Sequence, residues 1–354
     1  MKGINLLLLL IPVSIALEMN HVGGAWVFIT AALAIIPLAA LMGKATEELS
    51  GQLGPSVGGL LNATFGNATE LIIVLFAVRA GEMAVVRTSL IGSIIGNILL
   101  VLGLSVLLGG LRYKRQRFSE DVAGVHTVML ILAVIALFTP SLFVHNVPGM
   151  LDTAANPRVE ALSLCVAGLL IAIYFGSLIF AFKTHQDIFR QGEEEEWEPP
   201  IWSKGRAFAV LGISTAMVAL ESEMLVSSIG PTVASWHISK VFVGIILVPI
   251  IGNAAEHATA VTMALKNKMD VTFNICISSS TQIAFFVAPL IVFVSLFMGH
   301  PFPFIFTNTE LISVGFSALI AAFIARDGQT HWLEGAQLLV VYILLALAFF
   351  FMPG

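Results

Sequence analysis

Charged residues are scarce in this chain: they make up 11% of its 354 residues, whereas hydrophobic residues make up 58%. A soluble protein of this size carries roughly a quarter charged residues. The mean hydropathy of +0.96 agrees with that deficit. The composition therefore excludes an ordinary soluble domain. It predicts an all-α polytopic membrane protein, because a helix satisfies its own backbone hydrogen bonds in lipid.

Cysteines and basic clusters are also nearly absent. Cys165 and Cys276 both lie in apolar runs, where cysteine serves as a small packing residue, so we expect no disulfide. The net charge is −5, and no basic cluster is interleaved with aromatic residues. We therefore expect no nucleic-acid partner.

Apolar segments of membrane-crossing length recur along the whole chain, and we predict eleven transmembrane helices. The first is short enough to imitate a signal peptide, but it lacks a clear small-residue cleavage site, so we predict that it is retained. The predicted spans cover residues 4–18, 24–43, 59–79, 86–110, 122–143, 160–182, 207–229, 240–265, 271–298, 308–325 and 332–352.

One long polar stretch divides the chain into two parts. The predicted organisation is an extra N-terminal transmembrane helix over 1–20, a first five-helix repeat over 21–182, a cytoplasmic acidic linker over 183–206 and a second five-helix repeat over 207–354. Within the linker, the acidic run at 193–198 is most simply a solvated loop. A regulatory cation site is the alternative interpretation of that run.

The distribution of lysine and arginine predicts the orientation in the membrane. With the N-terminus in the cytoplasm, the outer loops carry Arg79, Arg87, Arg158 and Lys240, and the other 13 of the 17 basic residues face inward. The N-terminus is thus predicted to be cytoplasmic and the C-terminus to be outside. The compact chain and its short loops favour the plasma membrane of a prokaryote.

A short motif occurs twice, as GNATE at 66–70 and GNAAE at 252–256. The copies lie in the third and eighth predicted spans, and an odd offset of five spans makes them cross the membrane in opposite directions. The chain is therefore predicted to be an inverted repeat of five plus five helices with one extra helix, a recurrent design of transporters.

Each motif pairs an amide with a carboxylate at the i, i+3 spacing, Asn67 with Glu70 and Asn253 with Glu256, which places both on one helix face. Ionisable groups at membrane depth are costly and mark ion or proton paths by default. Carboxylate and amide oxygens suit calcium. After the cation leaves, two carboxylates in a low-dielectric site repel each other and take up protons. That competition predicts antiport. The alternative is that both glutamates are protonated and only hold helices together.

Polar residues follow each motif at matching offsets. Ser93 and Ser279 both lie 23 residues after their glutamate, and each is followed by an amide, Asn97 or Gln282. These side chains would complete an oxygen shell around a cation or orient the glutamates. Polar side chains also join helices without any ligand, and that interpretation stays open.

Backbone-weakening residues accompany the motifs: Gly66 and Gly252 begin them, and Pro249 precedes the second. They favour a broken helix that lines a cavity, although glycine also serves close helix packing.

Four further titratable residues lie near the motifs. His257 follows Glu256 and is interpreted either as a proton shuttle or as a packed imidazole. At least one of the glutamates at 221 and 223 is expected to face a wet cavity. A predicted entry vestibule that concentrates cations is formed by Glu48, Glu221 and Glu223.

With these motifs in view, the chain resembles the calcium/proton exchanger (CAX) family of the calcium:cation antiporter superfamily. GNATELIIVLFAVRAG at 66–81 and GNAAEHATAVTMALKNKMD at 252–270 are similar to its two signature repeats, and SSSTQIA at 278–284 is close to its GSSTQIA. Ser278 departs from the family's usual glycine. The likeness covers nearly the whole chain, including eleven helices and an acidic loop after the sixth.

The resemblance implies calcium efflux driven by proton influx. It implies that Glu70 and Glu256 are alternately calcium-bound and protonated, with Asn67, Asn253, Asn97 and Gln282 near the ion path. The expected substrates are Ca²⁺ and H⁺, with no cofactor, and the expected surroundings are a lipid bilayer. The oligomeric state stays open, with a homo-oligomer as one possibility.

Three other functions fit parts of the same sequence. A sodium-coupled calcium exchanger shares the inverted repeat and differs in the driving gradient. A membrane metalloenzyme is disfavoured, because the zinc motif HxxEH would need histidine where the chain has Asn253, and no HExxH occurs. A passive channel is disfavoured by the paired carboxylates and the repeat.

Overall fold

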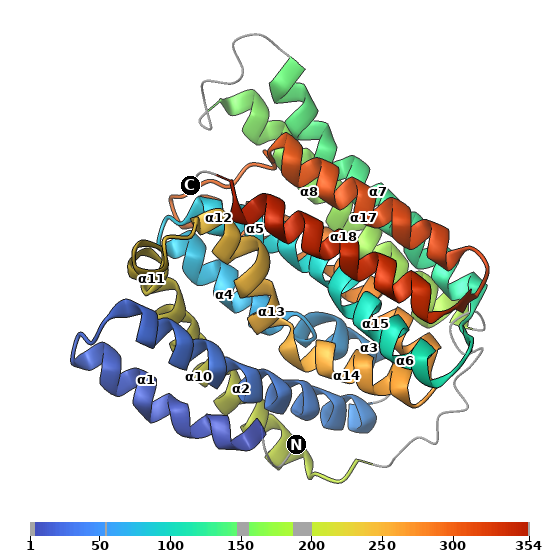
Figure 1. Ribbon diagram of the computed structural model, residues 1–354, viewed down its shortest axis with the longest axis horizontal. Coiled ribbons are helices and arrows are strands. Elements are labelled where there is room, and N and C mark those ends of the chain that lie inside the picture. The colour runs from blue at the N-terminus through green and yellow to red at the C-terminus, as the bar shows by residue number, and fades with distance from the viewer. Residues whose placement is uncertain (1–3, 54, 147–155, 187–199, 353–354) are drawn as a thin grey trace. The chain divides into compact units, whose positions relative to one another are not determined.

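The computed structural model describes residues 4–53, 55–146, 156–186 and 200–352, and these are overwhelmingly helical (Figure 1). Among them, 8 helices are long and apolar enough to cross a membrane, or up to 9 if one bent pair counts as a single span. The membrane class predicted from composition is therefore confirmed. The exact number of eleven spans stays a prediction, and the acidic run at 193–198 lies outside the described residues.

The elements follow one another along the chain with short connections. In order they are the 3₁₀ helix η1 (Ile4–Leu9), α1 (Leu10–Met19), α2 (Gly24–Leu53), α3 (Pro55–Phe65), α4 (Ala68–Arg79), α5 (Met83–Ile95), the π-helix η2 (Gly96–Val101), α6 (Leu102–Arg112), β1 (Gln116–Arg117), α7 (Glu120–Asn146), α8 (Pro157–Ile179), the π-helix η3 (Phe180–Thr184), α10 (Lys204–Ser227), α11 (Ile229–Trp236), α12 (Lys240–Phe242), the π-helix η4 (Val243–Leu247), α13 (Val248–Gly252), α14 (Ala254–Leu265), α15 (Met269–Gln282), the π-helix η5 (Ile283–Val287), α16 (Ala288–Phe297), α17 (Asn308–Ala325), β2 (Gln329–Thr330) and α18 (Trp332–Phe350).

The chain folds into two compact units, and each unit takes segments from both halves of the sequence. Unit 1 comprises Met1–Ser89, Glu195–Glu256 and Ala348–Gly354, and unit 2 comprises Leu90–Glu194 and His257–Leu347. The two motifs both belong to unit 1. The repeat boundaries predicted from the sequence stay a prediction.

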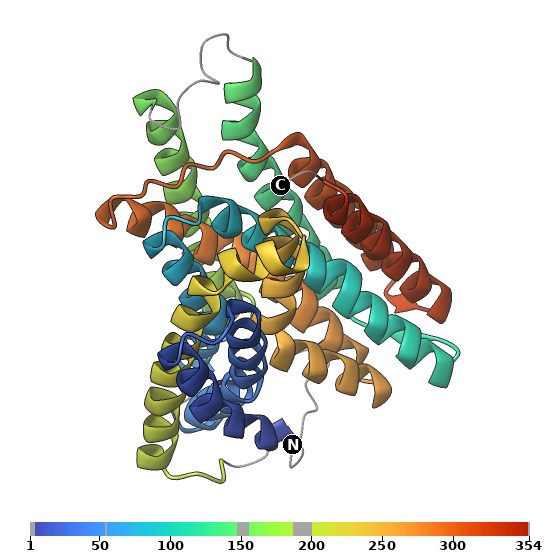
Figure 2. The same ribbon diagram turned by 60° about the vertical axis from the view of Figure 1, so that its left-hand side comes forward.

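Unit 1 is built around α2 and α10, which run antiparallel. Thr215 Oγ1 lies 3.3 Å from Met42 Sδ, and Gln52 Nε2 donates to the carbonyl of Trp202 at 2.9 Å. Helix α4 packs on α10, and α1 packs on α2 as a hairpin at the blue end of the chain (Figures 1 and 2). Small and aliphatic side chains fill the contact, with a buried cluster formed by Met42, Ala45, Leu49, Ala68, Ala207 and Leu211.

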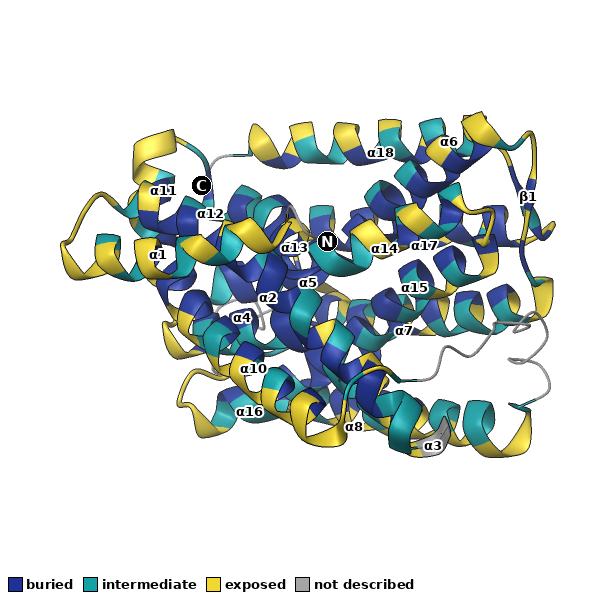
Figure 3. Ribbon diagram, turned by 90° about the horizontal axis from the view of Figure 1, so that it is seen from below, coloured by how far each residue is buried: buried dark blue, intermediate teal, exposed yellow. Residues whose placement is uncertain are grey.

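Unit 2 contains the helices from η2 to η3 and from α15 to α17, together with the larger parts of α14 and α18. Two serines hold the segment that precedes α17 against α7 and α8. The backbone nitrogen of Phe306 donates to Ser141 Oγ at 2.9 Å, and that of Phe304 donates to Ser163 Oγ at 3.1 Å. The strands β1 and β2 pair antiparallel, with Gln116 opposite Thr330. The π-helix η2 is among the most buried elements of unit 2, and Figure 3 shows the dark blue of buried residues on α2 of unit 1.

Two predicted spans are interrupted, as the glycines and Pro249 of the motifs favour. The span predicted over 59–79 is two helices, α3 and α4, and the span predicted over 240–265 is divided among α12, η4, α13 and α14. Helix α11, between the predicted seventh and eighth spans, was missed. It ends at His237, whose φ of 56° is left-handed, and the axis bends by 118° between α11 and the segment Lys240–Gly252.

Glycines allow α6 and α18 to approach closely in unit 2. A Cβ at Gly335 would clash with the backbone nitrogen of Leu107, and one at Gly103 would lie 3.0 Å from Leu338 Cβ. Small residues at such contacts let helix backbones pack together in a membrane, where the hydrophobic effect adds little.

We predict that Gly335→Ala lowers the unfolding free energy by about 1–3 kcal/mol, since overpacking forces backbone shifts. The measurement is the thermal unfolding midpoint of the purified protein in detergent. Gly168→Ala on α8 is the matched control, because nothing lies within 4 Å of a Cβ built there. Equal midpoints for the two variants would refute the packing role of Gly335.

Candidate functional site

Both motifs interrupt a helix at the asparagine, in almost the same backbone conformation. Asn67 has φ −100° and ψ 19°, and Asn253 has φ −105° and ψ 9°. Two segments that share four of five motif residues therefore share their local fold as well. The broken helix expected from the glycines and Pro249 is present in both copies.

The break places each glutamate at the beginning of a new helix. Glu70 lies in the first turn of α4, and Glu256 lies in the first turn of α14. The amide dipoles of a first turn stabilise negative charge, so each carboxylate lies where its helix tolerates an anion best. The segment before each break ends there as well, as α3 at Phe65 and α13 at Gly252. Helix ends that meet inside a membrane protein are typical sites for ions.

The two motifs contact each other within unit 1. Asn253 Nδ2 donates a hydrogen bond to Glu70 Oε1 at 3.2 Å. A Cβ built on Gly252 would lie 3.6 Å from the Cβ of Glu70, so the backbone of the second motif runs directly beside the first glutamate. The structure thus brings Glu70 and Asn253 together from positions 183 residues apart.

The carboxyl group of Glu70 is completely buried, and it is only partly satisfied. Its exposed fraction is 0%, and Oε2 accepts no hydrogen bond from any residue that the structure describes. Glu256 is half-buried, and its charge acts on Glu70 as like-charge repulsion. Asn67 and Asn253 are buried beside them. Two repelling carboxylates with an open acceptor atom form a site that a cation or protons would stabilise.

The supporting polar residues belong to unit 2. His257 Nε2 and Asn97 Oδ1 lie 3.2 Å apart, which joins α14 to the beginning of η2. Ser93, Asn97 and Ser279 are buried. Gln282 is half-buried and donates through Nε2 to Ser278 Oγ one turn earlier, at 3.3 Å. Their predicted roles toward a cation stay predictions.

A π-helical segment follows each motif at nearly the same distance, and neither segment was predicted from the sequence. Segment η2 begins 26 residues after Glu70, at Gly96, and η5 begins 27 residues after Glu256, at Ile283. One of the two amides predicted to serve the site lies where each α-helix changes into a π-helix. Asn97 is inside the first turn of η2, and Gln282 directly precedes η5. Single π-helical turns in α-helices occur often at functional sites, because the wider turn changes the direction of side chains.

The three residues of the predicted vestibule have different surroundings. Glu48 is buried, and its Oε2 accepts a hydrogen bond from the backbone nitrogen of Trp202 at 2.8 Å. Glu221 is completely buried, whereas Glu223 is exposed and lies 3.6 Å from Arg79 in an ion pair. The vestibule stays a prediction, for which Glu223 is the exposed member.

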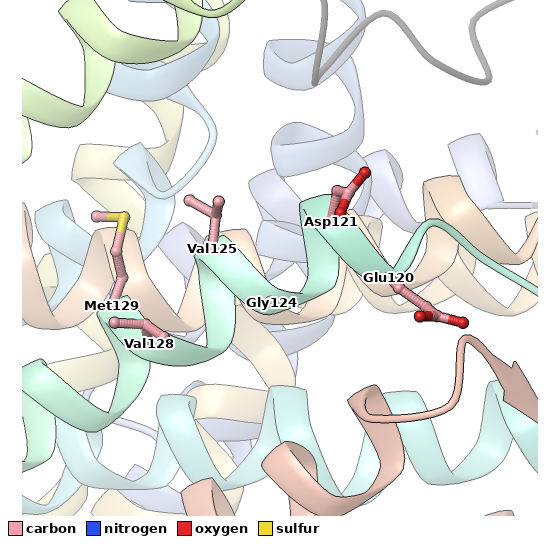
Figure 4. A pocket seen from close by; sticks show the side chains of 6 residues that line it. All are labelled: Glu120, Asp121, Gly124, Val125, Val128 and Met129. Atoms are coloured by element: carbon pink, nitrogen blue, oxygen red, sulfur yellow. The ribbon is translucent and has the colours of Figure 1, made fainter.

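No alternative centre competes with the two motifs in the part of the chain that the structure describes. No three histidine, cysteine, aspartate or glutamate side chains gather there in a way that would hold a metal ion. A surface groove on α7 is lined by Glu120, Asp121, Gly124, Val125, Val128 and Met129. Figure 4 shows its two carboxylates on different sides of the helix, so they do not converge on one ligand.

We predict that Asn253→Ala raises the Ca²⁺ concentration for half-maximal transport about 10- to 100-fold. The substitution removes the hydrogen bond that orients Glu70, and hydrogen bonds to charged groups contribute about 1.5–3 kcal/mol. Calcium uptake into vesicles, measured over a range of Ca²⁺ concentrations, tests this. The control is Asn62→Ala, an exposed amide on α3. An unchanged Ca²⁺ dependence in the Asn253 variant would remove this residue from the site.

Comparison with known proteins gives matches over nearly the whole chain. The family model described as "Sodium/calcium exchanger protein" matches residues 23–183 and 206–351. The protein named Ca(2+)/H(+) antiporter of Aphanothece halophytica is 44% identical, over 98% of this chain and 96% of that protein. The protein named Ca(2+)/H(+) antiporter ChaA of Bacillus subtilis (strain 168) is 42% identical, over 96% of each.

A solved structure agrees with the fold. The crystal structure of the selenium-substituted Ca2+/H+ antiporter protein YfkE superposes with a TM-score of 0.85 and is 38% identical to this chain. The match covers 99% of this chain and 100% of the other. The helical fold is therefore shared with a known transporter structure.

Proposed function

Because the chain belongs to the sodium/calcium exchanger protein family, we propose that it is a secondary active antiporter that exports Ca²⁺ from the cytoplasm in exchange for H⁺. The observation that carries this proposal is the contact between the motifs, in which Asn253 of one holds the buried Glu70 of the other. The protein is a transporter rather than an enzyme, its substrates are Ca²⁺ and H⁺, and we expect no bound cofactor.

The cation would be bound by Glu70 and Glu256, with Asn67 and Asn253 supplying amide oxygens. Two carboxylates match the charge of one divalent ion, and calcium takes about six to eight oxygen ligands, so water or further protein oxygens would complete the shell. Asn253 already donates to Oε1 of Glu70, which leaves Oε2 as the atom open to a cation. The amide thus fixes the carboxylate in place before the ion arrives.

Protons would replace the cation because the empty site is electrostatically unstable. With calcium gone, two like charges face each other away from bulk water, and protonation removes the repulsion. One site that holds either a cation or protons, but not both, makes the two fluxes obligatorily coupled. Alternating access of an inverted repeat around this site is the mechanism that we propose for the exchange.

The supporting residues would assist cation binding and proton transfer at the two glutamates. Ser93, Asn97, Ser279 and Gln282 would complete or orient the oxygen shell, and His257, held by Asn97, would relay protons. The two π-helical transitions support these roles, since each places an amide at a widened turn. Residues Glu48 and Glu223 would attract cations to the entrance.

We further propose the plasma membrane of a prokaryote as the location, with the N-terminus in the cytoplasm and the C-terminus outside. The excess of basic residues in the predicted inner loops supports this orientation. The eleven-helix inverted repeat is part of the proposal, with the matching dihedral angles at Asn67 and Asn253 as its support.

The driving ion is tested in sealed vesicles that contain the purified protein. We predict that an imposed pH gradient drives Ca²⁺ accumulation without sodium, and that a protonophore abolishes it. The control is the same vesicles without a gradient. Accumulation that requires a sodium gradient instead would assign the protein to sodium-coupled calcium exchange, the activity that the family model's description names.

We predict that Glu70→Gln and Glu256→Gln each reduce exchange by about 100-fold or more while the protein stays folded, because glutamine keeps the shape and removes the charge that balances the cation. Vesicle flux and the unfolding midpoint are measured together. Glu18→Gln serves as the control, since Glu18 is exposed on α1. Full exchange in a folded variant at either motif would rule out that glutamate as a cation ligand.

A further inference from the structure

A third carboxyl group is buried in unit 1, apart from the two motifs. Glu221, near the end of α10, has an exposed fraction of 0%. Its Oε1 lies 2.8 Å from Ser14 Oγ, which belongs to α1. Its Oε2 is also buried and accepts no hydrogen bond from any described residue. The mechanism of exchange proposed above makes no use of this group.

Ser14 has a special place in α1. The structure describes every residue of Leu10–Met19, and Ser14 is the only one that is buried. Apolar residues of this helix, such as Val13 and Met19, are exposed, as expected for a helix that faces lipid. The attachment of α1 to α10 is therefore centred on one polar contact, with Glu221 as the partner.

The hydrogen atoms of this contact can be arranged in two ways. Ser14 Oγ lies 2.8 Å from the carbonyl oxygen of Ile11 as well as 2.8 Å from Glu221 Oε1. A hydroxyl group has one hydrogen to donate. If Glu221 is ionised, Ser14 donates to the carboxylate. If Glu221 is protonated, it donates to Ser14 Oγ, and Ser14 donates to Ile11. The same heavy-atom positions therefore accept both protonation states.

The two states differ in how well the carboxyl group is satisfied. In the ionised state, Oε2 is a charged atom without a partner in a buried position, which is unfavourable. Protonation removes the charge and so lowers that cost without any movement, although Oε2 still accepts no hydrogen bond from a described residue. The ionised carboxylate can otherwise be stabilised only by water, which reaches Glu221 when α1 separates from α10. A proton on Glu221 thus favours the packed arrangement of the two helices.

The charged groups on α2 lie far from Glu221 along the helix axis. On α2, Lys44, Glu47 and Glu48 lie beyond Met42, toward Trp202. Met42 itself is level with Thr215, about 9 Å along α10 from Glu221 at 1.5 Å per residue. On α1, Glu18 is exposed one turn after Ser14. Helix α11 carries no titratable side chain.

The remaining charged groups are on α4 and on α10 itself. Arg79 at the end of α4 pairs with Glu223, which is exposed, and Glu70 lies nine residues earlier on the same helix. Lys204 and Arg206 are at the opposite end of α10. Ser14 is the only hydrogen-bond partner of Glu221 among the described residues, so no basic side chain stabilises its charge there.

We propose that Glu221 and Ser14 form a second proton-binding site, distinct from the paired glutamates of the motifs, which holds α1 against α10 while Glu221 carries a proton. Loss of this proton loosens α1 and makes transport depend on pH beyond the exchange itself. The existence of the site is independent of the proposed function, whereas its effect on the transport rate rests on it.

The first experiment detects the proton directly in the protein embedded in lipid. Infrared difference spectra between two pH values are recorded for the unaltered chain and for Glu221→Gln. A carboxylic acid band that changes with pH in the unaltered protein and is missing from the variant supports the site. A band that does not change over the pH range in which the protein stays folded overturns it, because Glu221 would then be permanently protonated or ionised.

Two further variants secure the assignment. Ser14→Ala shifts the midpoint of the band, since it removes the donor to the ionised form, and Glu18→Gln leaves the midpoint unchanged. If Glu221→Gln does not fold, the Ser14 variant decides alone: an unshifted midpoint in that variant overturns the pairing.

The second experiment measures the effect on transport. Calcium uptake into vesicles is recorded from low to high pH for the unaltered protein and for Glu221→Gln, whose amide imitates the protonated acid. We expect rates close to those of the unaltered protein at low pH and a flatter profile above it. Profiles of identical shape overturn the coupling of this site to transport. An absence of proton-driven uptake in the unaltered protein instead refutes the proposed function and leaves the spectroscopic result standing.

Discussion

A carboxylate inside a membrane protein is stable only if a cation, a proton or fixed dipoles balance its charge. Glu70 illustrates how the local structure meets this constraint. Its helix begins at Ala68, so the amide dipoles of the first turn act on the carboxylate, and Asn253 donates to one of its oxygens. These two contributions are incomplete, because the second oxygen has no partner among the described residues. In the exchange that we propose, this incompleteness is what lets an exchangeable ion bind, because a fully satisfied carboxylate would have no need of one.

The broken helices follow from the same constraint. A continuous helix uses its own amides for its own carbonyls and leaves no dipole for a buried side chain. Interrupting it at Asn67 and at Asn253 creates a helix end at each glutamate, and the polar asparagine occupies the position that leaves the helix. The near identity of the two conformations indicates that the duplicated sequence encodes a duplicated backbone path.

The sequence allowed the membrane class, the duplicated motif and the pairing of the two copies to be predicted, and the contact between Asn253 and Glu70 agrees with a site assembled from both halves. Charge and amide placement carry this information directly. The interruption of the spans at 59–79 and 240–265 agrees with the glycines and Pro249 of the motifs, but its exact position was not predicted, because hydropathy reports the composition of a segment and not the path of its backbone. The π-helical segments η2 and η5 are equally invisible, since an added residue in a turn leaves no mark in an apolar sequence. The burial of Glu221 could not be predicted for another reason. The sequence places it two residues from Glu223, and only the packing of the helices decides that Glu221 is buried and Glu223 exposed.

The position of Ser14 bears on the order in which the protein is made. Its partner Glu221 lies 207 residues further along the chain, which corresponds to about 10–40 s of synthesis at roughly 5–20 residues per second. During that interval, α1 resides in the bilayer without α10. The carbonyl of Ile11 gives Ser14 a hydrogen-bond acceptor within its own helix. The hydroxyl hydrogen of α1 is therefore satisfied before α10 has been synthesised. When α10 arrives, Glu221 gains a partner that is already oriented, on a helix that was made long before it.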